Sequence, residues 1–360
     1  MRDTRPLIVG AGPAGCAAAI TLAQAGARPL VLERERTPAD PLCGGFLSWT
    51  ALPRLARLGV DVAVLGARPV TALALFAGPI RAASPLPAPA ASLSRGALDA
   101  ALQAQAEACG AEIRCGIHVR GADDLARLAC DAAGTQAAGP VVLATGKHEM
   151  RDFPRQSPAA DPVLGLRWRL ALTPAMQTTL TGLIELHCFA GGYAGLSLQE
   201  DGRANLCLAM RASRFDACGK RPDGVLRALH AECPALAGRL DAALSVEDAA
   251  AVANVPNGWR AAEALGVFRV GDQAGCIASL SGEGIALALG TGIAAGEALL
   301  RGDGADAFRG RLAPGLVGPI AVAQGIKWIA EKPMAARLAT GVAGAIPALS
   351  RAAAQAMRLR

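Results

Sequence analysis

The feature that most constrains this fold is a glycine-rich turn close to the N-terminus. The turn consists of Gly10, Ala11, Gly12, Pro13, Ala14 and Gly15, which fit the pattern G-x-G-x-x-G. An apolar run at 6–9 precedes it, a helix-forming run at 17–24 follows it, and a second apolar run at 29–32 ends in Glu33. Such glycines permit the tight turn, the close approach of a pyrophosphate and the packing of helix against strand. The segment therefore predicts a βαβ unit that binds a dinucleotide at the helix N-terminus.

Acidic residues at the ends of two predicted strands indicate which dinucleotide binds. Glu33 is placed to accept hydrogen bonds from a ribose 2′-OH, and its negative charge disfavours the 2′-phosphate of NADP. Asp272 ends a predicted strand at 266–272. The segment 281–285 then opens a helix whose N-terminus can face the pyrimidine edge of a flavin. A site built from both ends of the chain suits the long FAD molecule better than NAD, so we predict FAD as the cofactor.

The order of the predicted elements indicates an α/β fold whose two parts are interleaved along the chain. A helix at 94–110, capped by Ser94, and a buried strand at 141–144 extend the N-terminal unit. Alternating apolar residues and turn residues predict further, antiparallel strands at 66–93, 162–173, 180–189, 192–200 and 203–211. We therefore predict a three-layer, Rossmann-type FAD-binding domain with an interleaved antiparallel β-sheet substrate domain and C-terminal helices.

The domain boundaries follow from this interleaving. The predicted FAD-binding domain is discontinuous and comprises 1–65, 94–150 and 266–304. The substrate domain comprises 66–93 and 151–265, and a helical segment covers 305–360.

Helices are predicted over 222–245, 284–300 and 305–360, the last of them rich in alanine. We expect breaks in the C-terminal helices at Pro314, Pro319, Pro333 and Pro347. The uncharged stretch that contains the first two prolines is shorter than the roughly 20 apolar residues of a spanning helix, so no membrane span is predicted. Basic residues around apolar turns leave peripheral membrane contact open beside simple packing on the FAD-binding domain; they are Arg337, Arg351, Arg358 and Arg360.

The composition excludes several classes of protein. With 52% hydrophobic and 18% charged residues, the chain cannot be intrinsically disordered. Aromatic residues make up only 3%, which argues against binding of single-stranded nucleic acid, and the net charge of +6 requires no anionic partner. No C-x-x-C pair occurs among ten cysteines, so no metal site is predicted. The N-terminus lacks the pattern of a signal peptide, so we expect reduced thiols and a cytoplasmic location.

Five segments that span most of residues 6–300 carry a family resemblance. They are GAGPAG at 10–15 with Glu33, CGGFLS at 43–48, Arg95 in LSRGALDAAL, VVLATG at 141–146, and VGDQAG…SGEGIALAL within 270–289. The chain resembles the glutathione-reductase-type FAD oxidoreductases. It is most similar to the branch that contains geranylgeranyl reductases, para-hydroxybenzoate-hydroxylase-like monooxygenases and flavin halogenases. As a set, the segments are specific for FAD and not for the reaction.

The resemblance implies which residues contact FAD. They are Gly10, Gly12, Pro13, Ala14, Gly15, Glu33, Arg34, Cys43, Gly44, Gly45, Arg95, Val119, Ala144, Thr145, Gly146, Gly271, Asp272, Gly282, Gly284 and Ile285. The first glycines would cradle the pyrophosphate, Val119 would contact adenine through its backbone, and Asp272 and Gly284 would contact the ribityl chain and the flavin ring. Arg95 could instead be a surface arginine, and Asp272 a turn-capping residue.

Four residues are candidates for catalysis, and Cys43, Tyr193 and His187 are the leading ones. The loop that begins at Cys43 passes beside the flavin ring in similar proteins, and a thiol there could donate a proton; a buried core cysteine is the alternative. Tyr193, the only tyrosine, could donate a hydrogen bond to the substrate or simply pack in a turn. His187 and, after it, His148 are the histidines best suited to acid–base chemistry, although a lone histidine is often structural.

Departures from the family patterns bear on the reaction. Thr145 stands where hydroxylases of this type carry an aspartate linked to handling of the pyridine nucleotide. The halogenase motif W-x-W-x-I-P is missing and the four lysines are not at suitable positions, which disfavours halogenation. Around Tyr193, the tryptophan, phenylalanine and proline of the geranylgeranyl reductase motif Y-x-W-x-F-P are missing.

The predicted activity is that of an FAD-dependent oxidoreductase on a lipophilic small molecule that is aromatic, polyketide-like or isoprenoid-like. The leading reaction is monooxygenation through a flavin hydroperoxide, with NAD(P)H as a transient electron donor. Reduction of a carbon–carbon double bond is the alternative, and a non-catalytic flavin-binding protein is an alternative of another class.

Overall fold

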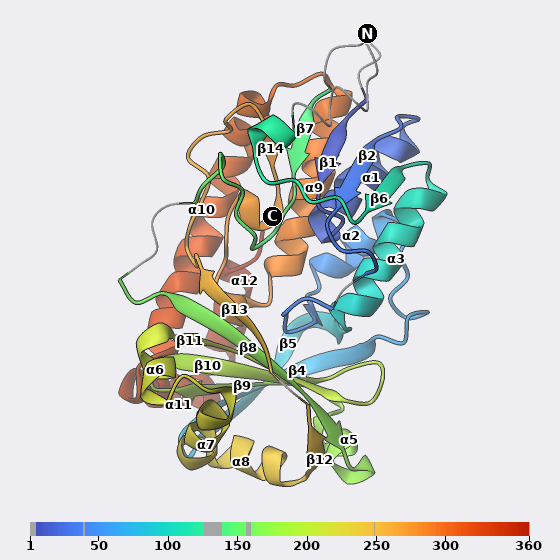
Figure 1. Cartoon of the computed structure of the whole chain (residues 1–360). Coiled ribbons are helices and arrows are strands. Elements are labelled where there is room, and N and C mark those ends of the chain that lie inside the picture. Colours follow the sequence, from blue (N-terminus) through green and yellow to red (C-terminus); the bar gives the residue numbers. More distant parts are fainter. Residues whose placement is uncertain (1–4, 39, 126–138, 156–159, 248, 360) are drawn as a thin grey trace.

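The computed structural model describes residues 5–38, 40–125, 139–155, 160–247 and 249–359, which form two sheets stacked one above the other in Figure 1. The upper sheet is parallel, with the order β14-β7-β1-β2-β6. Its strands are β1 (Leu7–Val9), β2 (Leu30–Glu33), β6 (Glu112–Cys115), β7 (Val141–Leu143) and β14 (Phe268–Arg269). Two apolar strands flank β1, which confirms the predicted βαβ unit and its parallel sheet.

Helices cover one face of this sheet. They are α1 (Pro13–Gln24), α2 (Ala51–Arg57), α3 (Arg95–Ala108) and α9 (Gly284–Leu300). Ser94 caps α3 as predicted, with its side chain accepting a hydrogen bond from the amide of Ala97. A Cβ on Gly292 of α9 would lie 2.2 Å from the carbonyl oxygen of Ala14, so small residues in α9 allow the close packing of α1. The opposite face packs against buried residues of the segments 117–125 and 150–153.

The lower sheet has nine strands, with β13 beside the path β12-β8-β11-β10-β9-β4-β5-β3. Their bounds are β3 (Phe46–Leu47), β4 (Arg68–Ala77), β5 (Ile80–Ser92), β8 (Val163–Leu172), β9 (Gly182–Phe189), β10 (Gly192–Leu198), β11 (Ala204–Arg211), β12 (Ala243–Val246) and β13 (Ala250–Val255). Every pair is antiparallel except β4 with β9. The predicted interleaved antiparallel sheet is therefore confirmed, and its members come from before and after the helix α3.

Short helices pack on the lower face of this second sheet, as Figure 1 shows. They include α7 (Pro222–Glu232) and α8 (Pro234–Asp241), with α5 (Pro174–Leu180) and α6 (Ala212–Ala217) at its rim. The helical region predicted over 222–245 is confirmed as far as Asp241, but it consists of two helices, because Cys233 interrupts the helical backbone before Pro234, and β12 then begins. The strand predicted over 266–272 is also shorter, because Gly271 has φ +58° and turns the chain into the 3₁₀ helix η1 (Gly271–Gln273).

Three helices complete the chain: α10 (Ala305–Ala330), α11 (Pro333–Ala345) and α12 (Pro347–Ala356). Pro333 and Pro347 each begin a helix, as expected. The breaks predicted at Pro314 and Pro319 are wrong, because α10 continues through both prolines. By length and composition alone α10 could cross a membrane, with a mean hydropathy of 1.2 and 22% of its most apolar window buried, but core helices meet the same criteria. Arg360 lies outside the described residues.

Candidate functional site

A cavity of about 880 Å³ lies between the two sheets. It begins at the carboxyl ends of β1, β2, β7 and β14, where ligands bind in open α/β sheets. From there it continues along the upper face of β4, β9 and β10 to the inner side of α11 and α12. All the residues that the sequence assigns to FAD, apart from Gly15, line this cavity.

The glycine turn leaves space exactly where a phosphate is expected to bind. Gly10 has φ +103°, and a Cβ there would lie 2.5 Å from the carbonyl oxygen of Ala144. A Cβ on Gly15 would lie 1.9 Å from the carbonyl oxygen of Gly10, so this glycine serves the packing of α1 under the strand. Above Gly12, in contrast, the nearest atom to a Cβ is Nη2 of Arg95, at 3.6 Å. The helix α1 begins with Pro13 and has no side-chain cap, so its first amides remain available to an anion.

Glu33 lies at the carboxyl end of β2 and borders the same cavity. Its Oε2 accepts a hydrogen bond of 2.7 Å from the amide of Ala11, and its Oε1 accepts one of 3.0 Å from the amide of Glu35. These two bonds fix the carboxylate beside the glycine turn and leave further acceptor positions on both oxygens. Arg34 and Val119 line the cavity nearby.

Arg95 is held by a buried partner on its own helix. Its Nε and Nη2 donate to the two carboxylate oxygens of Asp99, at 2.9 and 2.8 Å. Burial alone would lower the pKa of Arg95, but Asp99 outweighs it and raises the pKa above its usual value. Burial raises the pKa of Asp99. Both residues line the cavity, so Arg95 is not a free surface side chain, and its contact with the flavin phosphates stays a prediction.

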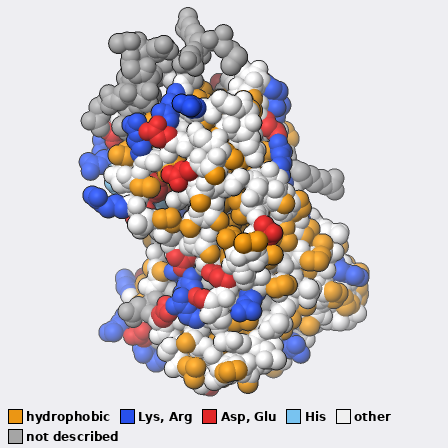
Figure 2. Space-filling model, turned by 90° about the vertical axis from the view of Figure 1, so that its right-hand side faces the viewer, with side chains coloured by type: hydrophobic (Ala, Val, Ile, Leu, Met, Phe, Trp, Pro, Cys, Tyr) orange, Lys and Arg blue, Asp and Glu red, His pale blue; other side chains and the backbone are white. Residues whose placement is uncertain are grey.

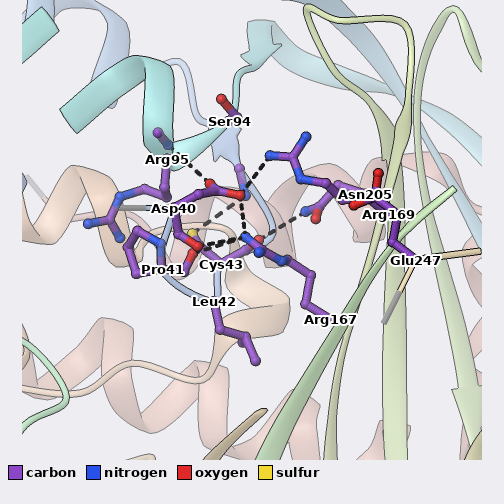
Figure 3. Close-up of polar contacts among 12 residues, drawn as sticks. Asp40, Pro41, Leu42, Cys43, Ser94, Arg95, Arg167, Arg169, Asn205 and Glu247 are labelled. Carbon is purple, nitrogen blue, oxygen red and sulfur yellow. Dashed lines mark hydrogen bonds and ion pairs between the residues drawn. The ribbon is translucent and has the colours of Figure 1, made fainter. Parts of the chain in front are cut away.

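The loop that leads to Cys43 is fixed by the second sheet (Figure 3). Asp40 accepts hydrogen bonds of 2.7 Å from Arg167 and 2.7 Å from Arg169, both on β8. Burial raises the pKa of Asp40, but the hydrogen bond from Arg169 and the charge of Arg167 outweigh it, and the net pKa is lowered. Asn205 of β11 donates to the carbonyl oxygen of Cys43 at 2.9 Å. The loop therefore has a defined position over the cavity.

Cys43, Gly44 and Gly45 present this loop to the cavity. The Cys43 sulfur accepts a hydrogen bond of 3.4 Å from the amide of Gly45 and also interacts with Arg95. A Cβ on Gly44 would meet nothing within 4 Å, so the backbone there is open to a ligand. At Gly45, φ is +69° and a Cβ would lie 2.6 Å from the carbonyl oxygen of Leu93, so only glycine fits.

The distal wall of the cavity is formed by two segments. In the first, Ala144, Thr145 and Gly146 follow β7, and the Thr145 hydroxyl donates to the carbonyl oxygen of His148 at 2.9 Å. Burial, together with Arg34 and Arg155, lowers the pKa of His148.

The second segment contains Gly271 and Asp272 in η1, Gly282 with φ +66°, and Gly284 and Ile285 at the start of α9. A Cβ on Gly284 would meet nothing within 4 Å, and the first turn of α9 has no side-chain cap, so the backbone at the start of α9 is open to a ligand.

Tyr193 lies in the cavity wall with its hydroxyl already engaged. The hydroxyl lies 2.7 Å from Oγ of Ser279 and accepts a hydrogen bond of 3.3 Å from the amide of Leu280. Burial raises the pKa of Tyr193, so the phenol is neutral. These bonds connect β10 to the 3₁₀ helix η2 (Ser279–Ser281), and they favour a positioning role over proton transfer.

The structure does not bring His187 to the cavity, and our expectation for this residue is corrected. Because side chains alternate along β9, Ile184 and Leu186 line the cavity and His187 faces α8. His187 is fully buried, stacks on Phe76 with 4.6 Å between ring centroids, and lies 3.2 Å from a carboxylate oxygen of Glu185. Arg239 of α8 completes this cluster by pairing with Glu185 at 2.9 Å.

Several residues of the site were missed by sequence reasoning. Lys147 lines the cavity, and its Nζ donates to the carbonyl oxygen of Leu42 at 3.3 Å, so one lysine does lie near the predicted flavin position. Its place directly after Gly146 was a usable signal. Arg358, near the end of the chain, also lines the cavity and pairs with the buried Glu283. No local pattern in the sequence indicates that contact.

The comparisons with known proteins agree with this geometry. Residues 3–126 match the family model described as "FAD binding domain". This part of the chain is similar to that family. It covers the glycine turn, Glu33, the Cys43 loop and α3. The narrower resemblance to geranylgeranyl reductases and hydroxylases stays a prediction.

One curated relative and several solved structures are similar to most of the chain. A menaquinone reductase of Mycolicibacterium smegmatis is 27% identical over 327 residues, covering 83% of this chain and 77% of the relative. The flavin-dependent brominase Bmp2 has a TM-score of 0.75 at 17% identity, covering 98% of this chain and 93% of its own. PqsL, a probable FAD-dependent monooxygenase from Pseudomonas aeruginosa, has a TM-score of 0.69 at 16% identity, covering 94% and 99%. These structures confirm the predicted fold class.

Proposed function

We propose that this protein is an FAD-dependent oxidoreductase that acts on a lipophilic small molecule. The observation that carries the proposal is how the lining of the large cavity changes along its length. Its upper part is lined by the glycine turn, Glu33 and the Cys43 loop, as an FAD site requires. Its lower part is lined by aliphatic side chains from both the sheet and the C-terminal helices.

The residues present fit FAD at the upper end. The open space above Gly12, the uncapped start of α1 and the fixed carboxylate of Glu33 would hold the pyrophosphate and the adenosine ribose. Asp272 and the free amides at the start of α9 would receive the ribityl chain and the flavin ring. When bound, FAD supplies the redox chemistry, and the protein supplies orientation and exclusion of water.

The lower part of the cavity supports a lipophilic substrate that is aromatic, polyketide-like or isoprenoid-like. Its aliphatic lining comes from two directions: the sheet provides Leu73, Leu75, Leu186 and Val252, and the helices α10 and α11 provide Ile326, Ile329 and Val342. Burial of such surface contributes about 25 cal/mol for each square ångström removed from water. Polar groups such as Ser197 and Asn257 also line this part, so a substrate that is mainly apolar could still carry a few polar atoms.

Monooxygenation, with NAD(P)H as a transient electron donor, is the leading reaction that we propose. Reduction of a carbon–carbon double bond is the second candidate, and two features of the site favour it. The Cys43 thiol faces the cavity, and a thiol beside the flavin ring could give a proton to carbon. Thr145 replaces the aspartate of the hydroxylase pattern. The relative named as a menaquinone reductase agrees with this second candidate.

A turnover experiment separates the two reactions. FAD-loaded protein is mixed with NADH or NADPH and a panel of lipophilic aromatic, polyketide and isoprenoid compounds, with and without oxygen. Monooxygenation gives oxygen uptake and a product heavier by one oxygen atom. Reduction gives, without oxygen, a product heavier by two hydrogen atoms, and a Cys43→Ser variant then loses turnover while it retains FAD. A flavin that no reductant bleaches would contradict both and indicate a non-catalytic flavin-binding protein.

We also propose that the C-terminal helices contact a membrane surface, from which a lipophilic substrate reaches the cavity. More than half of the exposed large hydrophobic side chains among the described residues lie in 317–349, including Trp328, Met334 (70% exposed) and Leu338 (69% exposed). Val342 and Leu349 are about half exposed and also line the cavity, so its opening lies within this apolar face.

Charge supports the same proposal. Between residues 307 and 360 the only acidic residue is Glu331, which is paired with Arg211 and Lys327, whereas eight residues are basic. Figure 2 shows, for comparison, the side of the molecule that lies on the right in Figure 1, and there acidic and basic side chains lie next to one another. Arg311, Lys327 and Arg358 are paired with carboxylates, whereas Lys332, Arg337 and Arg351 form no ion pair among the described residues. An apolar face that also carries such basic residues is suited to anionic lipid.

Vesicle co-sedimentation tests this contact. We expect binding to vesicles that contain phosphatidylglycerol, and weaker binding by a variant with both Met334→Ser and Leu338→Ser. Val64→Ser is the matched control, because Val64 is 82% exposed but lies far from these helices in the sequence. Equal sedimentation of both variants and the wild type would contradict the proposal.

A further inference from the structure

A second, separate cavity of about 370 Å³ lies on the other side of the segment that walls the FAD end of the large cavity. Val270 and Gly271 line the large cavity, whereas Arg269 and Ala274 line the second one. Its remaining walls are the segment 258–264 and the first half of α10, which runs beside the parallel sheet in Figure 1. None of the residues assigned to FAD lines it.

A buried arginine without a counterion faces this cavity. Arg269 is 6% exposed, and its Nη2 donates to the carbonyl oxygen of Phe153 at 2.9 Å. The guanidinium lies over the ring of Trp259, 5.2 Å from the centroid, while its Nε has no hydrogen-bond partner. No carboxylate among the described residues forms an ion pair with it. Burying a cation in this way is unfavourable unless an anion compensates it.

The other charged groups at the cavity add to the positive charge. Arg260 and Arg309 also line it, and no ion pair involves either of them among the described residues. The Nε of Arg309 is buried without a partner. Glu263 is the one carboxylate in the lining and is exposed. Burial and the nearby Arg155 both lower the pKa of Arg269, which agrees with an excess of positive charge.

The rest of the lining is apolar. It consists mainly of Ala261, Ala264, Val267, Ala274, Phe308 and Leu316. The volume falls within the range of about 300–1,000 Å³ that is typical of small-molecule sites. The cavity therefore combines cationic hydrogen-bond donors with an apolar lining. A ligand that suits both has an anionic group and an apolar part.

We propose that this cavity binds a small amphipathic anion, in which a carboxylate or phosphate is joined to a short apolar body. The head group lies between the guanidinium groups of Arg269 and Arg309, whose geometry suits two parallel hydrogen bonds to an oxyanion. The apolar body packs on Phe308 and Leu316. This site is independent of the substrate end of the large cavity and of the reaction proposed above.

Calorimetric titration of the FAD-loaded protein with octanoate, octyl phosphate and octanol tests the site. We expect at least one of the two anions to bind with one site per chain. The neutral octanol should bind at least about tenfold more weakly, which corresponds to a difference of about 1.4 kcal/mol in binding free energy. The comparison of octanoate with octyl phosphate decides which head group is preferred. No saturable binding of either anion, or equal affinity for octanol, would overturn the proposal.

Variants place the bound anion. Arg309→Gln is expected to weaken binding about tenfold, and Ala313→Trp, which fills the cavity, is expected to abolish it. Arg311→Gln is the matched control, because Arg311 lies on the same helix but pairs with Asp303 outside the cavity. All three variants should keep their FAD content. Binding that survives both Arg309→Gln and Ala313→Trp would place the probe in the large cavity and refute the site.

Discussion

Arg358 illustrates how single residues join distant parts of this chain. It lies two residues from the C-terminus, yet its Nη1 donates to the carbonyl oxygen of Ser281 at 2.9 Å and pairs with Glu283. Glu283 is completely buried, directly before the first turn of α9, and it also accepts a hydrogen bond of 2.9 Å from Thr50. The end of the chain therefore fixes the loop that would face the flavin ring.

Replacing Arg358 is expected to loosen this loop. In Arg358→Gln the buried Glu283 loses its cation, and breaking a buried ion pair costs about 3 kcal/mol. We expect the free energy of unfolding to fall by about that amount and the dissociation constant of FAD to rise. Chemical denaturation and FAD titration measure the two effects. Arg351→Gln, on the exposed side of α12, is the control, and an equal effect of both variants would contradict this role.

Asp40 gives a prediction about pH. Its pKa in the folded protein is lowered because Arg169 and Arg167 outweigh the effect of burial. A lowered carboxyl pKa stabilises the fold above the unfolded value of about 3.9, and this contribution is lost as the pH falls through the folded pKa. Asp40→Asn should therefore be less stable than the wild type at pH 7, with a smaller difference below about pH 4. Urea denaturation at several pH values measures it. A difference that does not narrow at low pH would argue against the ion pairs.

Residue roles were predictable where one local pattern determines them. Glu33 follows directly from the βαβ pattern, and the structure places it beside the glycine turn. The side of the sheet on which His187 lies depends on the pairing of β9 with β4 and β10, which no local pattern specifies. The contact of Arg358 with Glu283 joins residues 75 positions apart and was likewise invisible in the sequence.

At the scale of elements, two glycines at the start of α1 have different roles: Gly15 is needed for packing, and Gly12 leaves space for the cofactor. Gly12 has open space above its Cα, whereas a Cβ on Gly15 would lie 1.9 Å from the carbonyl oxygen of Gly10. Gly12→Val is therefore expected to fold, and its affinity for FAD is expected to be at least about tenfold lower than that of the wild type. Gly15→Val is expected to fail to fold. Circular dichroism and FAD titration of both variants check this, and a folded Gly15→Val protein, or unchanged FAD affinity in Gly12→Val, would contradict the packing described.

The ends of helices and strands were predictable where capping or stop residues mark them in the sequence. The helix α3 has a capping serine and a glycine stop, and it lies where the sequence predicts it. The prolines inside α10 misled the prediction, because a helix interior tolerates proline when its backbone can bend. The short strand β14 was overextended in the prediction, since only its pairing with β7 determines where it ends.

For the whole molecule, the interleaved order of the elements was predictable, whereas the cavities were not. The two sheets alternate along the chain, and their strand patterns carry that order. The large cavity exists because the C-terminal helices return over β4 and β5, and the second one exists because α10 packs beside β14. Both depend on tertiary contacts between segments that are remote in sequence.

Reconstitution with FAD tests the central claim most directly. Purified protein is incubated with excess FAD, freed of unbound cofactor, and its flavin absorbance is compared with its protein concentration, with Gly12→Val treated in parallel. We predict a yellow protein with one FAD for each chain and a markedly lower content in the variant. Folded wild-type protein that stays colourless and retains no FAD would contradict the account.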